Sequence, residues 1–249
     1  HDSRYDRADD FLDLSYKLWE GSWEDGAVVA DKARRIHVLP DKVHGVSHEG
    51  PFYRTNAIHM SAPSPQRTPV LFQAGTSARG LRFAGQHAEG IFIGARTPEA
   101  ARDASRKLRQ APVDGRRPPE DIKIYVGVAV VPGRTEAEAR AKYAEYLAHA
   151  SPEGGLAHFA ASTGVDFAKY GLDEPIAFGN TNAIQSAAQA AQQQGLTTRR
   201  KLLEQFSLGS RYTTMVGDAS QVADELERWI DVGEIDGFNL TRIVVPETW

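Results

Sequence analysis

The feature that most constrains the fold is a regular alternation of short apolar runs with helical segments. The apolar runs occupy residues 69–75, 90–94 and 122–131. Continuous apolarity over such short lengths is typical of buried strands in a parallel sheet. Helical patterns follow the three runs at 78–88, 98–110 and 135–150. Strand and helix therefore alternate along the chain, and the pattern predicts an α/β fold.

The C-terminal part adds one more strand and several helices. An amphipathic helix is predicted over 220–232 and a fourth strand over 237–245. Residues 151–214 show no strand pattern and are rich in Ala, Gln and Gly, which predicts a helical insertion. Its helices are expected near 155–161, 183–194 and 198–206.

The N-terminal part has a different pattern. Apolar side chains recur at helical spacing over 3–20, which predicts an amphipathic helix that stops at Gly21. Residues 21–66 then break into segments rich in Gly, Pro and His, within which 48–58 are compatible with a short hairpin. Residues 21–66 thus form a long segment between two predicted core elements, the helix over 3–20 and the strand over 69–75.

Four predicted strands with crossover helices fit either an open doubly wound sheet or part of a (β/α)₈ barrel. A complete barrel takes about 250 residues and eight strands, whereas only four strong strands are predicted here. A barrel would therefore be represented by its C-terminal half with insertions, and other residues should complete its bare strand edges. The chain also begins without Met at what reads as a helix start and stops directly after a strand. We therefore expect it to be part of a longer chain.

Composition argues against several function classes. With 29 Lys and Arg against 33 Asp and Glu, the formal charge of −4 gives no overall field to attract nucleic acid. The absence of cysteine excludes disulfides, zinc-thiolate sites and a thiol nucleophile, and it fits a cytoplasmic location. No apolar stretch reaches the roughly 18 to 20 residues of a membrane-spanning helix. His44 and His48 lack a third ligand, so we expect no metal site.

The junction over 70–80 carries the strongest local signal for chemistry. A strand ends at Gly75 and passes through Thr76 and Ser77 into a helix. Backbone N–H groups, two hydroxyls and the positive end of a helix dipole then meet at one place, which suits a phosphate group. The glycines fit neither a Walker loop nor the dinucleotide fingerprint. The alternative is that Thr76 or Ser77 merely caps the helix.

A second signal lies at the start of the chain. His1 and Tyr5 are four residues apart, so on a helix they share one face and can both donate hydrogen bonds to an anion. The alternative is an exposed terminal residue next to an ordinary tyrosine of an amphipathic helix. Neither signal alone decides between binding and structure.

Taken together, the motifs of this chain resemble one branch of the bacterial luciferase-like flavoproteins. That branch contains nitrilotriacetate monooxygenase and dibenzothiophene-sulfone monooxygenase, and its motifs occur here in the same order. They lie at 1–11, 16–23, 42–44, 48–52, 64–67, 70–75, 181–186 and 236–240.

The resemblance implies a (β/α)₈ TIM barrel of which residues 1–249 form a partial, single domain. It also implies an FMNH₂-dependent monooxygenase that uses O₂ to oxygenate an organosulfur compound, an aminopolycarboxylate or an alkane. A separate NAD(P)H-dependent flavin reductase would supply the reduced FMN. Carried over by position, the phosphate-binding tyrosine falls on Tyr5 with His1 beside it, and the hydroxyl pair after Gly75 falls on Thr76 and Ser77.

Two further residues are assigned to the substrate by the same resemblance. Phe92 is expected to form a pocket wall, with a buried core phenylalanine as the alternative. Ser162 stands where we expect some relatives to carry His or an aromatic residue. The insertion over 151–214 falls where this superfamily places a mobile lid that shapes substrate choice. Catalytic residues are not assigned.

Three expectations about the whole protein complete the interpretation. We expect a homo-oligomer, since dimers are common among relatives of this kind. Within enzymes, the alternative is a luciferase-like oxidoreductase that uses deazaflavin F420 for hydride transfer. Outside enzymes, the alternative is a non-catalytic flavin-binding or phosphate-binding protein, or an inactive fragment.

Overall fold

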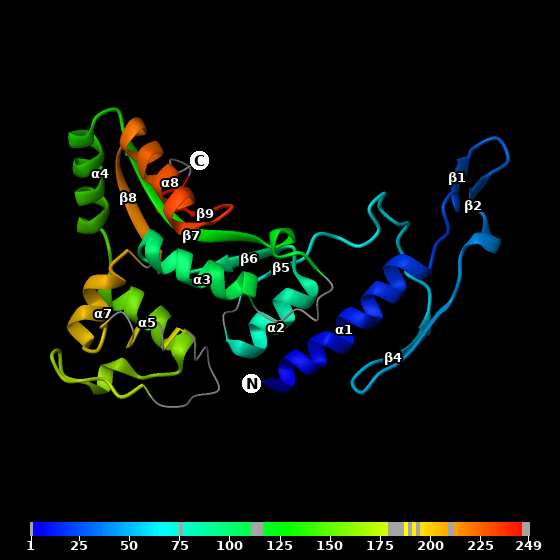
Figure 1. The fold of residues 1–249 in the computed structure, drawn as a ribbon, viewed down its shortest axis with the longest axis horizontal. Coiled ribbons are helices and arrows are strands. Elements are labelled where there is room, and N and C mark those ends of the chain that lie inside the picture. The colour runs from blue at the N-terminus through cyan, green and yellow to red at the C-terminus, as the bar shows by residue number, and fades with distance from the viewer. Residues whose placement is uncertain are drawn as a thin grey trace. The chain divides into compact units, whose positions relative to one another are not determined.

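The computed structural model divides the chain into two compact units, His1–Leu71 and Phe72–Trp249, called here the N-terminal and the C-terminal unit (Figure 1). The structure describes residues 2–74, 77–110, 117–178, 187–188, 191–192, 195–208 and 212–245.

The N-terminal unit consists of one long helix and two antiparallel hairpins. The helix α1 spans Asp2–Gly21, which confirms the prediction over 3–20. Strands β3 (Val46–Glu49) and β4 (Arg54–Ala57) form the hairpin expected within 48–58, with His48 paired to Thr55. A short 3₁₀ helix, η1 (Pro40–Lys42), precedes β3.

The other hairpin was not predicted. Strands β1 (Val28–Asp31) and β2 (Ile36–Val38) pair antiparallel with an irregular register. Their side chains are mostly exposed, so no apolar alternation marks them. The left-handed backbone lies at Ala30 and Arg35 rather than at glycine, so the usual turn signal is missing as well.

The C-terminal unit is built on a five-stranded parallel sheet. Its strands are β5 (Phe72–Gln73), β6 (Gly90–Ile93), β7 (Lys123–Gly133), β8 (Thr213–Asp218) and β9 (Gly237–Thr241). The long strand β7 pairs with β6 along its first half, with β8 along its second half and with β9 in the middle. Because β9 overlaps both partners in register, β6 and β8 share one edge of β7 and β9 lies on the other.

Two expectations about strands are corrected. Strand β8 was not predicted, and it begins at the end of the region 151–214 that was expected to hold no strand, because its sequence Thr-Thr-Met-Val-Gly-Asp carries only two large apolar residues. The predicted buried strand over 69–75 is reduced to Phe72–Gln73, and the side chains of Val70 and Phe72 are 56% and 54% exposed. Its described backbone pairs only with β6, so it is an edge strand rather than a buried one.

The predicted helices of the alternating region are all present. They are α2 (Ala78–His87), α3 (Pro98–Gln110), α4 (Glu136–Ala148) and α8 (Ala219–Gly233), with a short 3₁₀ helix, η2 (Pro119–Asp121), before β7. Helices α2, α3 and α8 bury apolar side chains against one face of the sheet. This core includes Ala84, Ile91, Ile93, Ala101, Leu108, Ile124, Val126, Val128 and Trp229.

The described part of the insertion contains helices and has an apolar core of its own. It contains α5 (Pro152–Thr163), η3 (Phe167–Lys169) and α7 (Arg199–Gln205), while most of the helix expected over 183–194 lies outside the described residues. The ring of Phe159 stacks on Phe206 and Phe167 with centroid distances of 4.4 and 5.5 Å. Among the helices of the described residues, none is long and apolar enough to cross a membrane.

Candidate functional site

The face of the sheet opposite the apolar core carries a cluster of aromatic rings. Residues alternate across a strand, so Ile91 and Ile93 enter the core while Phe92 points to the opposite face. There its ring stacks on Phe72 with a centroid distance of 5.3 Å and lies 5.9 Å from Tyr125. We call the surface formed by Phe72, Phe92 and Tyr125 the aromatic face.

A glycine makes this stacking possible. Gly90 lies opposite Phe72 in the register of β5 and β6, and an added Cβ atom at Gly90 would lie 2.3 Å from the Phe72 ring. The Phe72 ring therefore lies directly over backbone. Phe92 is half-buried and lies outside the apolar core, so the core alternative for Phe92 is wrong, whereas its role as a pocket wall stays a prediction.

The junction between β5 and α2 is described from Ser77 onward. Ser77 is the N-cap of α2, and its hydroxyl accepts a hydrogen bond of 3.1 Å from the backbone N–H of Gly80. The capping alternative therefore holds for Ser77. A serine hydroxyl that accepts one bond still has a proton to donate, so capping and anion binding are compatible at Ser77. Gly75 and Thr76 lie outside the described residues.

Tyr5 lies near the start of α1 and is half-buried, whereas His1 lies outside the described residues. Tyr5 belongs to the N-terminal unit and Ser77 to the C-terminal unit. Their convergence on one phosphate therefore stays a prediction.

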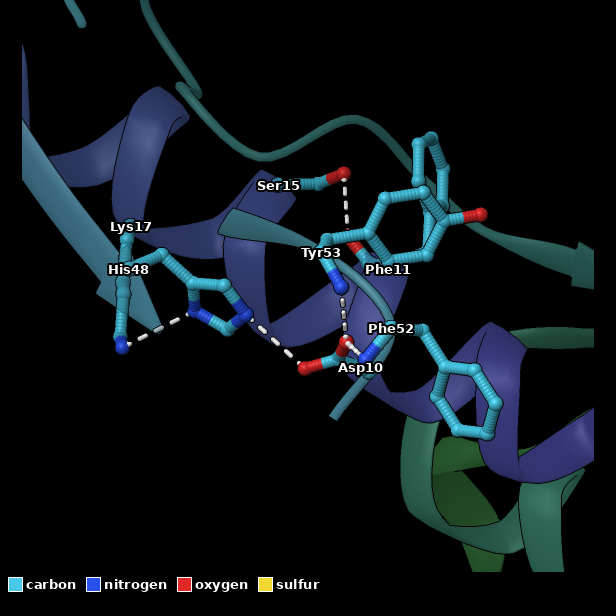
Figure 2. Close-up of polar contacts among 7 residues, drawn as sticks. All are labelled: Asp10, Phe11, Ser15, Lys17, His48, Phe52 and Tyr53. Carbon is cyan, nitrogen blue, oxygen red and sulfur yellow. Dashed lines mark hydrogen bonds and ion pairs between the residues drawn. The ribbon is translucent and has the colours of Figure 1, made fainter. Parts of the chain in front are cut away.

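Sequence reasoning missed a buried polar cluster that fixes the β3–β4 hairpin to α1 (Figure 2). One carboxylate oxygen of Asp10 lies 2.9 Å from His48 Nε2. The other accepts hydrogen bonds of 2.8 Å from the backbone N–H groups of Phe52 and Tyr53. The side chains of Asp10 and His48 are only 5% exposed. One carboxylate thus holds strand β3 and the turn that leads into β4.

The proton positions in this cluster follow from Lys17. Its ammonium group lies 3.1 Å from His48 Nδ1 and can only donate, so Nδ1 accepts and Nε2 carries the proton that Asp10 accepts. Burial raises the pKa of the Asp10 carboxyl, but the hydrogen bonds from Phe52, His48 and Tyr53 outweigh it and leave the pKa below its ordinary value. Asp10 is therefore a buried, fully hydrogen-bonded carboxylate.

The cluster also explains the motif at 48–52. An added Cβ atom at Gly50 would lie 1.7 Å from Asp10 Oδ1. Only glycine therefore lets the turn approach the carboxylate so closely. The signal for this contact was present in the sequence as two separate motifs, at 1–11 and 48–52, but no rule of spacing joins them.

Ser162 lies on α5, and its hydroxyl donates a hydrogen bond of 3.1 Å to the backbone carbonyl of His158. Such back-bonding to the preceding turn is common for serine within a helix. The side chain is half-buried, and its substrate-binding role stays a prediction.

Two cavities of the C-terminal unit adjoin the insertion. The larger, of about 970 Å³, lies between α4, the start of α5 and residues 243–244, which follow β9. The smaller, of about 290 Å³, lies where β6 has ended and β8 begins, and Arg96 lines it. Neither is lined by Phe92 or Ser162. Among the described residues, no three His, Asp or Glu side chains are grouped so that they could hold a metal ion.

Comparison with known proteins places the chain in one family. Residues 1–234 match the family profile of luciferase-like monooxygenases. The chain is 41% identical to the dimethyl-sulfide monooxygenase of Hyphomicrobium sulfonivorans over 249 residues, which are 99% of this chain and 52% of that protein. It is 38% identical to the long-chain alkane monooxygenase of Geobacillus thermodenitrificans, covering 100% of this chain and 53% of that protein. The chain thus spans about half the length of these curated relatives.

Solved structures give the same relationship. The crystal structure of the Hyphomicrobium sulfonivorans protein matches with a TM-score of 0.85, covering 100% of this chain and 53% of that one. A riboflavin lyase with modified FMN and its substrate riboflavin matches with a TM-score of 0.87 at 37% identity, covering 100% of this chain and 55% of that one. The fold is therefore of the luciferase-like α/β type.

Proposed function

The chain belongs to the luciferase-like monooxygenase family, and from that premise we propose that it forms part of an FMNH₂-dependent monooxygenase. The enzyme would use O₂ to oxygenate a small organic substrate and would receive reduced FMN from a separate reductase. The observation that carries this proposal is that 99–100% of this chain aligns with the dimethyl-sulfide and long-chain alkane monooxygenases.

The residues at the start of α2 suit the phosphate of FMN. The helix begins directly after Ser77, and its first N–H groups point away from the helix toward the preceding loop. The Ser77 hydroxyl adds a donor, and Tyr5 and His1 would add two more from the N-terminal unit. A phosphate monoester accepts several hydrogen bonds at once, so this donor set fits the group.

The aromatic face suits the ring system of the flavin. The exposed ring of Phe72 and the half-buried rings of Phe92 and Tyr125 lie together on one face of the parallel strands. A planar apolar ring system would pack on such a surface and lose contact with water. Reduced FMN, when bound, supplies the electrons for the reaction with O₂. The protein residues then hold and orient the cofactor and keep water away from it.

The sheet itself supports a partial barrel. Among the described residues, β5 pairs only with β6 and β9 pairs only with β7, so each leaves one parallel edge unpaired. We propose that residues outside this chain complete a (β/α)₈ barrel at these edges. The insertion over 151–214 would then act as a lid at the ends of the strands and shape the choice of substrate.

Anaerobic titration with FMNH₂, followed by fluorescence quenching, tests the proposal. Tyr5→Phe and Ser77→Ala should each weaken binding by about 1 kcal/mol, because each removes one hydrogen bond to the phosphate. Thr135→Ala is the matched control, since Thr135 caps α4 as Ser77 caps α2 and accepts from Glu138 N–H at 3.2 Å. It should leave FMNH₂ binding unchanged.

Other outcomes would replace this proposal with a specific alternative. Equal affinity of wild type and both variants would remove Tyr5 and Ser77 from the phosphate site. Tight binding of reduced F420 with no O₂-dependent product would indicate a hydride-transfer enzyme. Flavin binding with no turnover in the presence of any substrate class named above would indicate a non-catalytic protein.

A further inference from the structure

The cavity of about 290 Å³ in the C-terminal unit has a mostly polar lining. It is lined by five residues that carry hydroxyl groups and by one arginine, together with Glu204, Gln205 and Leu208. The hydroxyl groups belong to Tyr143, Ser207, Tyr212, Thr213 and Thr214. The volume corresponds to roughly ten water molecules, which is room for a small charged group with a short organic arm.

The guanidinium belongs to Arg96, which follows strand β6. The backbone of Arg96 is fixed, because the Thr213 hydroxyl lies 3.3 Å from the carbonyl oxygen of Ala95 and 3.2 Å from that of Arg96. The start of β8 therefore holds the loop after β6 in place. A side chain that leaves a fixed backbone position loses less freedom when it binds a ligand.

No carboxylate among the described residues forms an ion pair with Arg96. Glu204 lines the same cavity, but its charge acts on Arg200, one helical turn away on α7. Burial lowers the pKa of the Arg96 guanidinium, yet an arginine stays charged in proteins. The Arg96 side chain is exposed at the border of the cavity, and its positive charge lacks a counter-ion among the described residues.

The cavity also adjoins the aromatic face. Tyr212 lines the cavity, and its ring lies 2.3 Å from the position that a Cβ atom would take at Gly127. Gly127 follows Tyr125 by two residues on β7, so both lie on the same face of the sheet. Tyr212 therefore connects the cavity to the surface on which the flavin ring system is proposed to lie.

We propose that this cavity is a substrate subsite for an oxyanion, in which Arg96 binds a carboxylate or sulfonate group of a small organic substrate. This proposal rests on the proposed monooxygenase function and narrows its substrate class to anionic compounds. The guanidinium offers a planar pair of N–H donors that matches the two oxygens of a carboxylate. Tyr143 and Thr214 also line the cavity, and their hydroxyl groups can donate to the oxyanion without competing for the charge as a carboxylate would.

A ligand-observed NMR titration of the flavin-free protein tests the subsite with two probes, benzoate and its neutral counterpart benzamide. Arg96→Gln should weaken benzoate binding by about ten-fold or more, since it removes a charge-assisted hydrogen bond. Benzamide affinity should stay within about two-fold in the same variant. Arg96→Lys keeps the charge but loses the paired N–H donors of the guanidinium, so it should recover part of the benzoate affinity.

Arg54→Gln serves as the matched control for the change in net charge. Arg54 lies on β4 in the N-terminal unit, and its side chain is 78% exposed beside Glu49. This variant should bind both probes as wild type does. Unchanged benzoate binding in Arg96→Gln would overturn the proposal, and so would an equal loss of both probes, which would assign Arg96 a structural role.

A second arm separates a substrate oxyanion from the phosphate of FMN. Titrations with FMN and with riboflavin, which lacks the phosphate, should give the same affinity ratio in wild type and in Arg96→Gln. A selective loss of FMN affinity would assign Arg96 to the cofactor phosphate and overturn the substrate subsite. Because benzoate is titrated without flavin, failure of the flavin proposal at Ser77 would not change this result.

Discussion

In the N-terminal unit a buried carboxylate fixes a hairpin to a helix, whereas in the C-terminal unit apolar side chains fix helices to a sheet. Asp10 satisfies its oxygens with two backbone amides and His48. The apolar core instead packs Trp229 and its neighbours, whose attraction has no direction. Polar fixation depends on one exact geometry, whereas apolar packing depends on volume, so the two units should respond differently to substitution.

The largest effect is expected in the apolar core. Trp229 on α8 is 1% exposed, and Trp229→Ala should lower the free energy of unfolding of the C-terminal unit by about 3–5 kcal/mol, because it leaves a large cavity. Chemical denaturation measures this change. Ile230 follows on the same helix but is 44% exposed, so Ile230→Ala should cost less than about 1 kcal/mol. Similar losses for both variants would contradict the core described here.

A smaller effect is expected at the turn of the β3–β4 hairpin. Gly50→Ala should destabilise the N-terminal unit by about 1–3 kcal/mol, because the new methyl group would overlap the Asp10 carboxylate. Gly45→Ala is its control, since a Cβ atom there would lie at an ordinary 3.5 Å from Asn56. Amide hydrogen exchange of the hairpin would report both. A hairpin equally protected in the two variants would refute the close approach at Gly50.

The smallest effect at neutral pH is expected from Asp10→Asn. The amide oxygen can still accept from Phe52 and Tyr53, but its NH₂ group would face the N–H of His48 and lose one hydrogen bond. We expect the Phe52 and Tyr53 amides to exchange faster by about ten-fold.

The pH dependence of hairpin protection in wild type and in Asp10→Asn gives a second test of this carboxylate. The folded pKa of Asp10 lies below its unfolded value of about 3.9. Its contribution to stability is therefore complete above that value and is lost as the pH falls through the folded pKa. Wild-type protection of the hairpin should drop in this acid range, and Asp10→Asn should lack this component. An identical acid profile for the two proteins would show that Asp10 is not held as described.

The difference between apolar packing and polar fixation also explains what could be predicted from the sequence. Helical and strand periodicities predict α2, α3, α4 and α8 within two residues at each end, because burial against one sheet leaves a regular apolar pattern. The contact between Asp10 and His48 leaves no such pattern, because a hydrogen bond between residues 38 apart has no periodicity. Strand β8 was not predicted for a related reason, since Thr213 and Thr214 place hydroxyls where an apolar strand pattern would need apolar side chains.

The candidate site divides in the same way. Ser77 was predicted from local order alone, because a strand followed by hydroxyl residues and a helix marks a helix N-terminus. Arg96 gave no signal, because its environment is assembled from α4, α7 and β8 together. Local chemistry could thus be predicted, whereas a site that several distant elements build could not.

The way in which β7 is shared between three partners bears on how the unit folds. The Asp236 carboxylate before β9 accepts a hydrogen bond from the Ile124 amide of β7, and 112 residues separate the two. A long loop must close before that pairing forms, and its entropy cost grows with loop length. The insertion lies within this loop, and its core of Phe159, Phe167 and Phe206 can assemble from shorter-range contacts. We therefore expect an ordered sequence in which the insertion folds early, shortens the effective loop, and lets β9 join β7 last.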